Sequence, residues 1–172
     1  PRVDDKLLTK RLAQEAGIAV PELYAVARTN HDTRNLDALF GTHQDFVVKP
    51  AHGAGGEGIV IITGRSGTMY RKSSGALISK DAIGHHIGNI LSGMYSLGGQ
   101  PDNAMIEQRV EFDPLFERIT FQGVPDIRTV VYRGVPIMAM VRLPTRMADG
   151  KANLHQGAVG AGIDIATGTT LR

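Results

Sequence analysis

A lysine followed closely by four glycines is the feature of this sequence with the clearest chemical meaning. Lys49 ends a short apolar run, and a second β-branched run begins at Ile59. The glycines between these runs are Gly53, Gly55, Gly56 and Gly58. Glycine-dense backbone between two strands leaves several N–H groups free to turn toward an anion, because no Cβ stands in the way. With the charge of Lys49 at its base, the loop is expected to hold phosphate.

Three interpretations of this loop compete. Gly53-x-Gly55-x-x-Gly58 matches the dinucleotide-binding fingerprint, but that fingerprint requires a helix after it, and residues 59–62 are too few and too β-branched for one. The glycine-rich loop of kinases does lie in a hairpin. A kinase places its lysine after the loop, however, and the chain contains no H-R-D or D-F-G motif. An ordinary glycine-rich hairpin stays open at this point.

Two charged residues outside the loop stand near the ends of expected elements. Lys6 lies in the first turn of an expected helix, and Glu107 follows Ala-Met-Ile in an expected strand. Each also has an ordinary structural interpretation, Lys6 as a surface lysine and Glu107 as a solvated acid at a strand end. Neither residue identifies a site by itself.

The last third of the chain carries a second group of candidates. Asp126 and Arg128 are two apart on one face of a strand, where they could simply pair with each other or with a neighbour, and Arg142 stands at a strand exit. Asn153 and His155 are also two apart, in a loop (residues 144–157) too polar to belong to a core. These side chains are candidates for contact with a polar substrate.

Hydrophobic periodicity and turn signals predict an α/β chain. We expect helices at residues 4–16, 36–40 and 79–95. We expect strands at residues 23–26, 46–48, 59–62, 68–72, 104–110, 126–133, 135–142 and 158–165. Asp4 or Asp5 is the expected N-cap of the first helix, and Ser79 that of the third. The continuous apolar residues of the strands at 126–133 and 135–142 predict a buried sheet.

The third expected helix carries both an apolar stripe and two histidines. The stripe consists of Ile83, Ile87, Ile90, Leu91 and Met94. His85 and His86 lie on adjacent faces of the helix, so we do not expect them to share a metal.

Composition narrows the class of protein. With 172 residues, 42% of them hydrophobic, the chain can bury a core as one domain or two small lobes. A net charge of +2 is too small to predict nucleic acid as a main partner. No run approaches the roughly 18 apolar residues of a membrane span, so we expect no membrane partner. The absence of cysteine excludes disulfides and thiolate chemistry and fits a cytoplasmic protein.

The order of the motifs resembles the ATP-grasp superfamily, and its alpha-L-glutamate ligase-like (RimK-related) branch in particular. A lysine at a helix start is followed by a strand, a lysine, a glycine loop and a strand, and later by a strand that ends in E-Q-R-V. The most specific portion is D-I-R-T-V-V-Y-R-G, then M-V-R-L-P and A-N-L-H-Q-G. The resemblance extends from D-K-L-L-T-K-R-L-A to G-A-G-I-D, nearly the whole chain.

The resemblance implies a fold of two small lobes, with mainly antiparallel sheets that clasp a nucleotide. Residues 1–43 would lead into the grasp, residues 44–107 would form the small lobe, and residues 108–172 would form part of the large lobe. Lys6 and Lys49 would contact ATP phosphates as point charges, and the loop Gly53–Gly58 would close over them.

The remaining residues receive roles from the same resemblance. Glu107 would accept a hydrogen bond from the adenine amino group, and the backbone of Gln108 and Val110 would contact the adenine edge. Glu111 is the candidate for the ribose hydroxyls. For the reacting groups, Arg128 and Arg142 would bind the substrate carboxylate or the phosphoryl group, with Asn153 and His155 lining the reaction centre.

The implied activity is ATP-dependent carbon–nitrogen ligation. A carboxylate would become an acylphosphate, and an amine acceptor such as an amino acid or peptide would attack it to give an amide, ADP and phosphate. Mg²⁺ or Mn²⁺ would accompany the ATP, and glutamate would be the added group. A nucleotide-binding module without ligase activity is the alternative, and a kinase-like phosphotransferase is the third class.

One departure from the family pattern concerns the metal. ATP-grasp enzymes usually hold it with an acid on one late strand and a Glu-x-Asn motif on the next, and no Glu-x-Asn occurs in this chain. Asp164 is followed by Ile-Ala-Thr-Gly, which predicts a turn. The sequence begins without methionine at Pro1. We therefore expect a fragment of a longer ligase that lacks the metal ligands.

Overall fold

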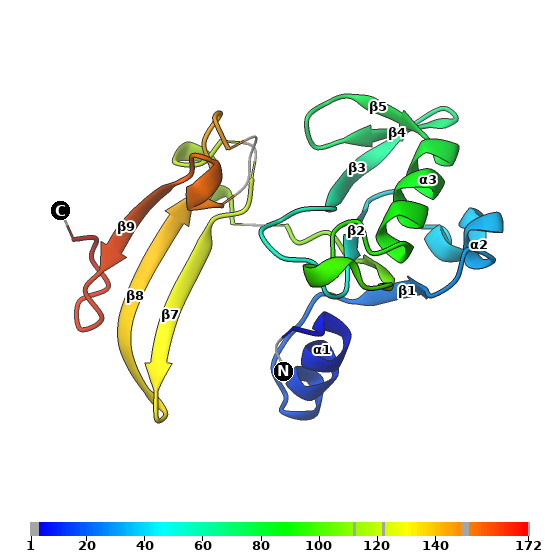
Figure 1. The fold of residues 1–172 in the computed structure, drawn as a ribbon. Helices are drawn as coiled ribbons and strands as arrows, with labels where there is room; N and C mark the ends of the chain where they lie inside the picture. Colours follow the sequence, from blue (N-terminus) through cyan, green and yellow to red (C-terminus); the bar gives the residue numbers. More distant parts are fainter. Residues whose placement is uncertain (1–3, 112, 122, 149–151, 172) are drawn as a thin grey trace. The chain divides into compact units, whose positions relative to one another are not determined.

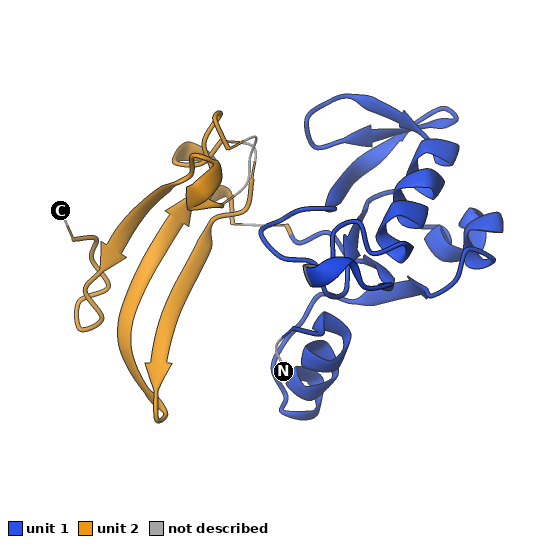
Figure 2. Ribbon diagram, viewed as in Figure 1, with its two compact units in different colours: residues 1–110 blue, residues 111–172 orange. Residues whose placement is uncertain are grey.

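The computed structural model describes residues 4–111, 113–121, 123–148 and 152–171. The chain divides into two compact units, residues 1–110 and 111–172 (Figure 2). The expected polar loop at 144–157 includes residues 149–151, which lie outside the described residues.

Unit 1 (residues 1–110) contains one mixed set of helices and strands (Figure 1). Its helices are α1 (Lys6–Glu15), α2 (Leu36–Phe40) and α3 (Lys80–Leu91), with the short 3-10 helices η1 (Asp32–Arg34) and η2 (Leu97–Gly99). Its strands are β1 (Leu23–Ala27), β2 (Phe46–Pro50), β3 (Val60–Ser66), β4 (Met69–Lys72), β5 (Leu77–Ser79) and β6 (Ala104–Glu107). The strands form a sheet in the order β1-β6-β2-β3-β4-β5, with every pair antiparallel.

The two expected N-caps explain where α1 and α3 begin. The Asp5 carboxylate accepts hydrogen bonds from the backbone N–H of Leu7 at 2.9 Å and of Leu8 at 3.1 Å. The Ser79 hydroxyl accepts from the backbone N–H of Ala82 at 3.1 Å. Each cap satisfies amide groups that the first helical turn leaves without an intrahelical acceptor.

The core of unit 1 lies between one face of the sheet and the helices α2 and α3. Phe40 of α2 stacks on Phe46 of β2 with ring centroids 4.7 Å apart, and Tyr70 meets both rings edge-on. Four of the five residues of the predicted stripe on α3 are buried, namely Ile83, Ile87, Ile90 and Leu91. Because β2 alternates, its buried Phe46 and Val48 face this core and Lys49 faces the other side of the sheet.

Unit 2 (residues 111–172) is built on a three-stranded antiparallel sheet in the order β7-β8-β9. Its elements are η3 (Pro114–Arg118), β7 (Asp126–Tyr132), β8 (Val135–Leu143), η4 (Leu154–Gln156) and β9 (Val159–Ile163). The expectation that β7 and β8 form a buried sheet is wrong, because Val131 is 57% exposed and Met138 59% exposed. A continuous apolar run implies burial only where a second layer covers the sheet, and the helices described in unit 2 are short 3-10 helices of five and three residues.

Other element boundaries differ from the expectation for local reasons. The third helix ends at Leu91 and not near Tyr95, since Gly93 adopts a φ of 84° that stops the helix. Met94 therefore lies beyond the helix, is 63% exposed, and does not belong to the stripe.

Two strands also differ in extent. The strand β3 continues to Ser66, beyond its expected end at Ile62, and its register with β4 shifts between Ile62 and Gly64, as in a bulge. The strand β6 ends at Glu107, three residues before its expected end at Val110. The short strand β5 was not predicted, and the remaining expected helices and strands are confirmed within a few residues. Among the described residues, no helix has the length and apolar character needed to cross a membrane.

Candidate functional site

The face of the unit 1 sheet opposite the core carries the charged residues of the candidate site. In β6, Ala104 and Ile106 belong to the core, so Met105 and Glu107 face the same side as Lys49 of β2. The register pairs Lys49 with Met105 and Val47 with Glu107, which makes Lys49 and Glu107 diagonal neighbours. Strand pairing therefore brings together two residues that are far apart in sequence.

Glu107 is a buried carboxylate, 4% exposed, held between two lysines. The ammonium group of Lys49 contacts its Oε1 atom, and that of Lys10 lies 3.0 Å from Oε2. Lys10 is itself buried, and its ammonium group also donates to the backbone oxygen of Pro21. Charge attraction joins Lys10 to Oε2 without an aligned hydrogen bond from any described residue. Two cations around one anion leave a surplus of positive charge.

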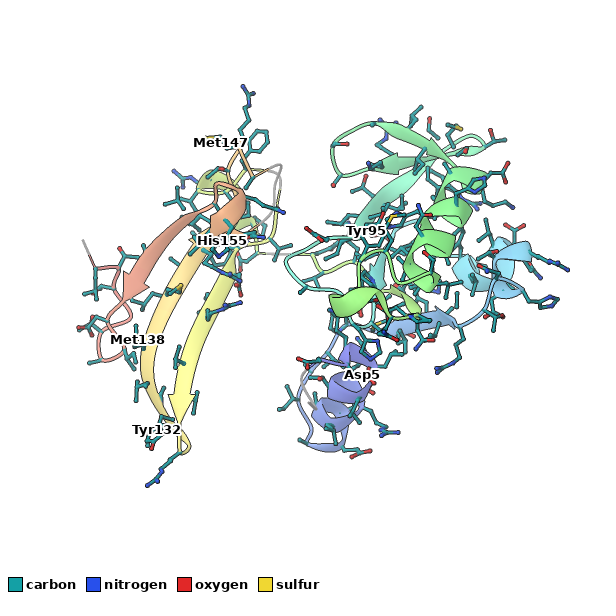
Figure 3. All side chains as sticks on the ribbon, viewed as in Figure 1. Asp5, Tyr95, Tyr132, Met138, Met147 and His155 are labelled. Carbon is teal, nitrogen blue, oxygen red and sulfur yellow. The ribbon has the colours of Figure 1, made fainter. Side chains whose placement is uncertain are left out.

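Lys6 adds a third cation one helical turn before Lys10 on α1 (Figure 3 labels the neighbouring cap Asp5). Its ammonium group donates to the backbone oxygen of Ala51 at 3.3 Å and to that of Gly53. Burial lowers the pKa of Lys6 most, and the charge of Lys49 lowers it further, against the opposing pull of nearby carboxylates. Lys6 is thus an electrostatically strained cation at the base of the glycine loop.

The glycine loop, residues 51–59, is fixed at both ends. The backbone of Gly53 bridges that of Ser96, and a Cβ on Gly53 would collide with Pro50. The oxygen of Gly58 lies 2.8 Å from Nε2 of His86, and a Cβ on Gly58 would meet the Tyr95 ring at 2.7 Å.

The loop also requires glycine for its backbone conformation. Gly55, Gly56 and Gly58 have φ values of 65°, 80° and 71°. Residues with a Cβ rarely adopt positive φ, so this loop shape selects glycine at these positions.

The segment after β6 is tied to the segments before β1 and β2. The Gln108 N–H donates to the backbone oxygen of Glu22 at 2.8 Å, and the Gln108 side-chain oxygen accepts from the Glu22 N–H at 3.2 Å. Nε of Arg109 donates to the Asp45 carboxylate at 2.9 Å. Val110 is 47% exposed at the end of unit 1, and Glu111 is the first residue of unit 2 and exposed.

Unit 2 holds the other predicted residues. Arg142 of β8 lies opposite Asp126 of β7 and forms an ion pair with it. The Nε–H of Arg142 is buried and finds no acceptor among the described residues. Arg128 shares their face of the sheet and is exposed. The Asn153 side chain accepts from the His155 N–H at 3.0 Å, and His155 is exposed on η4.

The turn η4 lies beside Arg142. Gly160 pairs with Arg142, so a Cβ on Gly160 would point to the same face, where it would meet Leu154 of η4 at 3.1 Å. Figure 3 shows His155 and Tyr132 at opposite ends of this sheet. Arg128, Arg142, Asn153 and His155 therefore belong to one end of this sheet, and Lys6, Lys49, Glu107 and the loop gather in unit 1.

Sequence reasoning missed three contributors. Lys10 could have been found from its spacing, because it follows Lys6 by four residues and so lies on the same face of the helix. Asp102 is buried behind the glycine loop, and Ser96 holds the loop backbone. No local pattern marks either of these two residues, because their roles arise from tertiary contacts.

The described residues contain no group of three or more His, Cys, Asp or Glu side chains placed to hold a metal ion. Asp164 forms the predicted turn, since its carboxylate accepts from the backbone N–H of Ala166 and of Thr167, both at 2.9 Å. The acidic and histidine side chains of the described residues therefore do not fit a metal ion held by protein ligands alone, and no reaction step here is assigned to a metal.

Replacing Lys10 with methionine should destabilise unit 1. The Glu107 carboxylate would stay buried with one of its two cations removed, at a cost on the order of 2–3 kcal/mol in the free energy of unfolding. Denaturant unfolding measures this, with Arg11→Met on the exposed face of the same helix as control. Adding Glu107→Gln to Lys10→Met should recover part of the loss. Equal stability of the Lys10 and Arg11 variants would contradict the ion-pair assignment.

Comparison with known families places the chain. Residues 1–172 match the family described as sugar-transfer associated ATP-grasp. A search of curated proteins finds no match. The mixed α/β fold with two antiparallel sheets is consistent with the ATP-grasp fold. The match confirms the superfamily and does not confirm the RimK-related branch. The chain belongs to the sugar-transfer associated ATP-grasp family.

Proposed function

We propose that unit 1 binds the phosphates of ATP with Lys6, Lys49 and the glycine loop. One observation carries this proposal: two lysines hold a single buried carboxylate, and a third lysine joins them at the base of a loop whose glycines have positive φ. Such backbone presents N–H groups to an anion, and the surplus charge favours a polyphosphate. Family membership supports ATP as the ligand.

The electrostatics of Lys6 support the same assignment. Its pKa is lowered because it is buried and faces Lys49, so the site without ligand holds two cations that repel each other. A phosphate between them would attract both ammonium groups. Because of this positive charge, we expect the site to bind an anion more tightly than a neutral ligand.

We assign the adenine end of ATP to the segment that follows β6. A carboxylate has about four lone-pair directions, so Glu107 can hold Lys49 and still accept from the adenine amino group. The Gln108 N–H is engaged by Glu22, which leaves the Gln108 carbonyl and the Val110 backbone for the adenine edge. Glu111 would contact the ribose. On this proposal residues 44–107 act as the small lobe, with residues 1–43 leading into it.

For the reaction we propose carbon–nitrogen ligation, with residues 108–172 as part of the large lobe. The γ-phosphoryl group would pass to a carboxylate oxygen and release ADP. An amine would then attack the acyl carbon and displace phosphate. Arg142, whose guanidinium is oriented by Asp126, and Arg128 would bind the carboxylate or the phosphoryl group. Asn153 and His155 would line the reacting atoms.

The family context bears on the cofactor and the substrate. ATP-grasp domains typically use Mg²⁺ or Mn²⁺ with ATP, where the ion neutralises phosphate charge. Glutamate as the added group came from the RimK-related resemblance, and the family match does not support it. We therefore propose the carboxylate and amine classes without naming the two substrates.

Substitution of Lys49 should weaken ATP binding. Lys49→Met removes one of the proposed phosphate contacts, and we expect at least a tenfold loss of affinity for ATP and ADP by calorimetry, in line with charged hydrogen bonds of about 1.5–3 kcal/mol. Lys80→Met is the matched control, because Lys80 pairs with Asp37 at 2.7 Å on the surface. Equal affinity of both variants, or no binding by the wild-type chain, would refute the nucleotide assignment.

ATP affinity should fall as the pH rises from neutral toward the ordinary lysine pKa of about 10.4. The pKa of Lys6 is lowered by burial and by Lys49, so Lys6 loses its proton earlier than an ordinary lysine, and its attraction for phosphate is lost with it. A pH series of ATP affinities measures this. Lys6→Met should bind more weakly at neutral pH and show a flatter profile. Parallel profiles for the two proteins would exclude Lys6 from the phosphate site.

A nucleotide-binding module without ligase activity is the second candidate. The observation that favours it is the lack of a metal-holding cluster among the described residues. Ligation predicts ADP formation that requires both a carboxylate and an amine, and that falls in Arg142→Met. ADP formation independent of the amine, or transfer of phosphate to a hydroxyl acceptor, would count against the ligase. ATP binding without turnover under all these conditions would favour the module.

A further inference from the structure

Asp102, just before β6, is a buried carboxylate with an unusual number of donors. It is 5% exposed, and its oxygens accept from the His52 N–H at 2.9 Å, from the Asn103 N–H at 2.7 Å and from the Ser96 hydroxyl at 3.0 Å. Nδ1 of the His52 ring lies 2.7 Å away. Burial alone would raise the pKa of Asp102, but the hydrogen bonds from His52, Asn103 and Ser96 outweigh it and lower the pKa. The group is a charged carboxylate in the fold.

Two of these donor residues, His52 and Ser96, are connected with the glycine loop. His52 lies one residue before Gly53, and Ser96 bridges Gly53 through its backbone while its hydroxyl donates to Asp102. Tyr95, the residue before Ser96, covers Gly58 at the other end of the loop (Figure 3). A single short segment, 95–102, therefore holds both ends of the glycine loop.

Further hydrogen bonds connect the segment after Asp102 with the loop base and Lys6. The Ala51 N–H donates to the backbone oxygen of Asn103 at 2.9 Å, and the Ala51 oxygen accepts from the Lys6 N–H at 3.0 Å. The oxygens of Ala51 and Gly53 are also the two that hold the Lys6 ammonium group. Movement of residues 51–53 would therefore move the Lys6 ammonium group.

His52 joins this network to the first helix. Its Nδ1 faces Asp102, and its Nε2 lies 3.9 Å from the carboxylate of Asp5, the N-cap of α1. The loop base, the segment before β6 and the start of α1 thus meet at the imidazole ring of His52. Within the stretch 54–57, the Glu57 N–H donates to the Ala54 oxygen at 3.1 Å in a backbone turn.

We propose that Asp102 is a positioning residue that fixes residues 51–53, and through them Lys6, in the arrangement that receives phosphate. The proposal rests on the function proposed above and adds a device to it: a rigid loop base that holds Lys6 in place. Asp102 acts through His52, Ser96 and Asn103, whose backbone oxygen accepts from the Ala51 N–H, and does not itself contact ATP.

Hydrogen exchange of the chain without nucleotide tests the device directly. Asp102→Asn keeps the size of the side chain but turns an NH₂ group toward donors, so amides at 52–58 should exchange about tenfold faster than in the wild type. Amides of α3 should change little. Asp37→Asn, a surface acid paired with Lys80, is the control. Unchanged exchange in the loop, or an equal rise throughout unit 1, would overturn the proposal.

A milder variant covers the case in which Asp102→Asn does not fold. Ser96→Ala removes one donor, and we expect a smaller rise in loop exchange, about threefold, with α3 protected as in the wild type. Unchanged loop exchange in Ser96→Ala would then overturn the proposal.

Nucleotide affinity separates the two proposals. If the wild type binds ATP, the folded variants should bind it several-fold more weakly, and unchanged affinity despite a loosened loop would overturn the positioning role. If the wild type binds no ATP, the proposed function fails, and the exchange data alone decide whether Asp102 fixes the loop.

Discussion

The site in unit 1 depends on a buried carboxylate that two lysines share. Burying the Glu107 carboxylate would cost much more free energy without nearby cations, and the buried Lys10 likewise needs the carboxylate. Because the three charges do not cancel, the cluster keeps one positive charge in excess, and Lys6 adds another. The interaction that stabilises this part of the fold therefore also leaves it ready to bind an anion.

Strand β6 is the element on which both halves of this arrangement meet. Asp102, two residues before its start, holds the base of the glycine loop, and Glu107 at its end holds Lys10 and Lys49. The strand lies between β1 and β2 in the sheet, with core residues on one face and the charged residues on the other. A strand paired on both sides is difficult to displace, so the glycine loop and the lysines are both attached to a rigid strand.

The sequence predicted the parts of this site that depend on local chemistry. Glycine at positive φ is a backbone requirement, and Asp5 and Ser79 cap helices through neighbouring amides, so both signals are local. The burial of Lys10 is not local, since it follows from a strand far along the chain. Met138 is an apolar residue that is exposed, and local sequence could not predict this either, because an apolar residue is buried only where another layer covers it. The roles of the predicted residues stay proposals.

The unpaired charge also bears on how stable the unit is without a ligand. Lys6 contacts backbone oxygens and faces another ammonium group, which is a poorer environment for its charge than water, as its lowered pKa records. Any anion that settles between Lys6 and Lys49 removes this repulsion, and the binding free energy adds to the stability of the folded state. Since the loop base is tied to Lys6 through Ala51 and Gly53, the same anion would tighten the loop. On the proposed function, binding and local order would therefore be coupled through the ammonium group of Lys6.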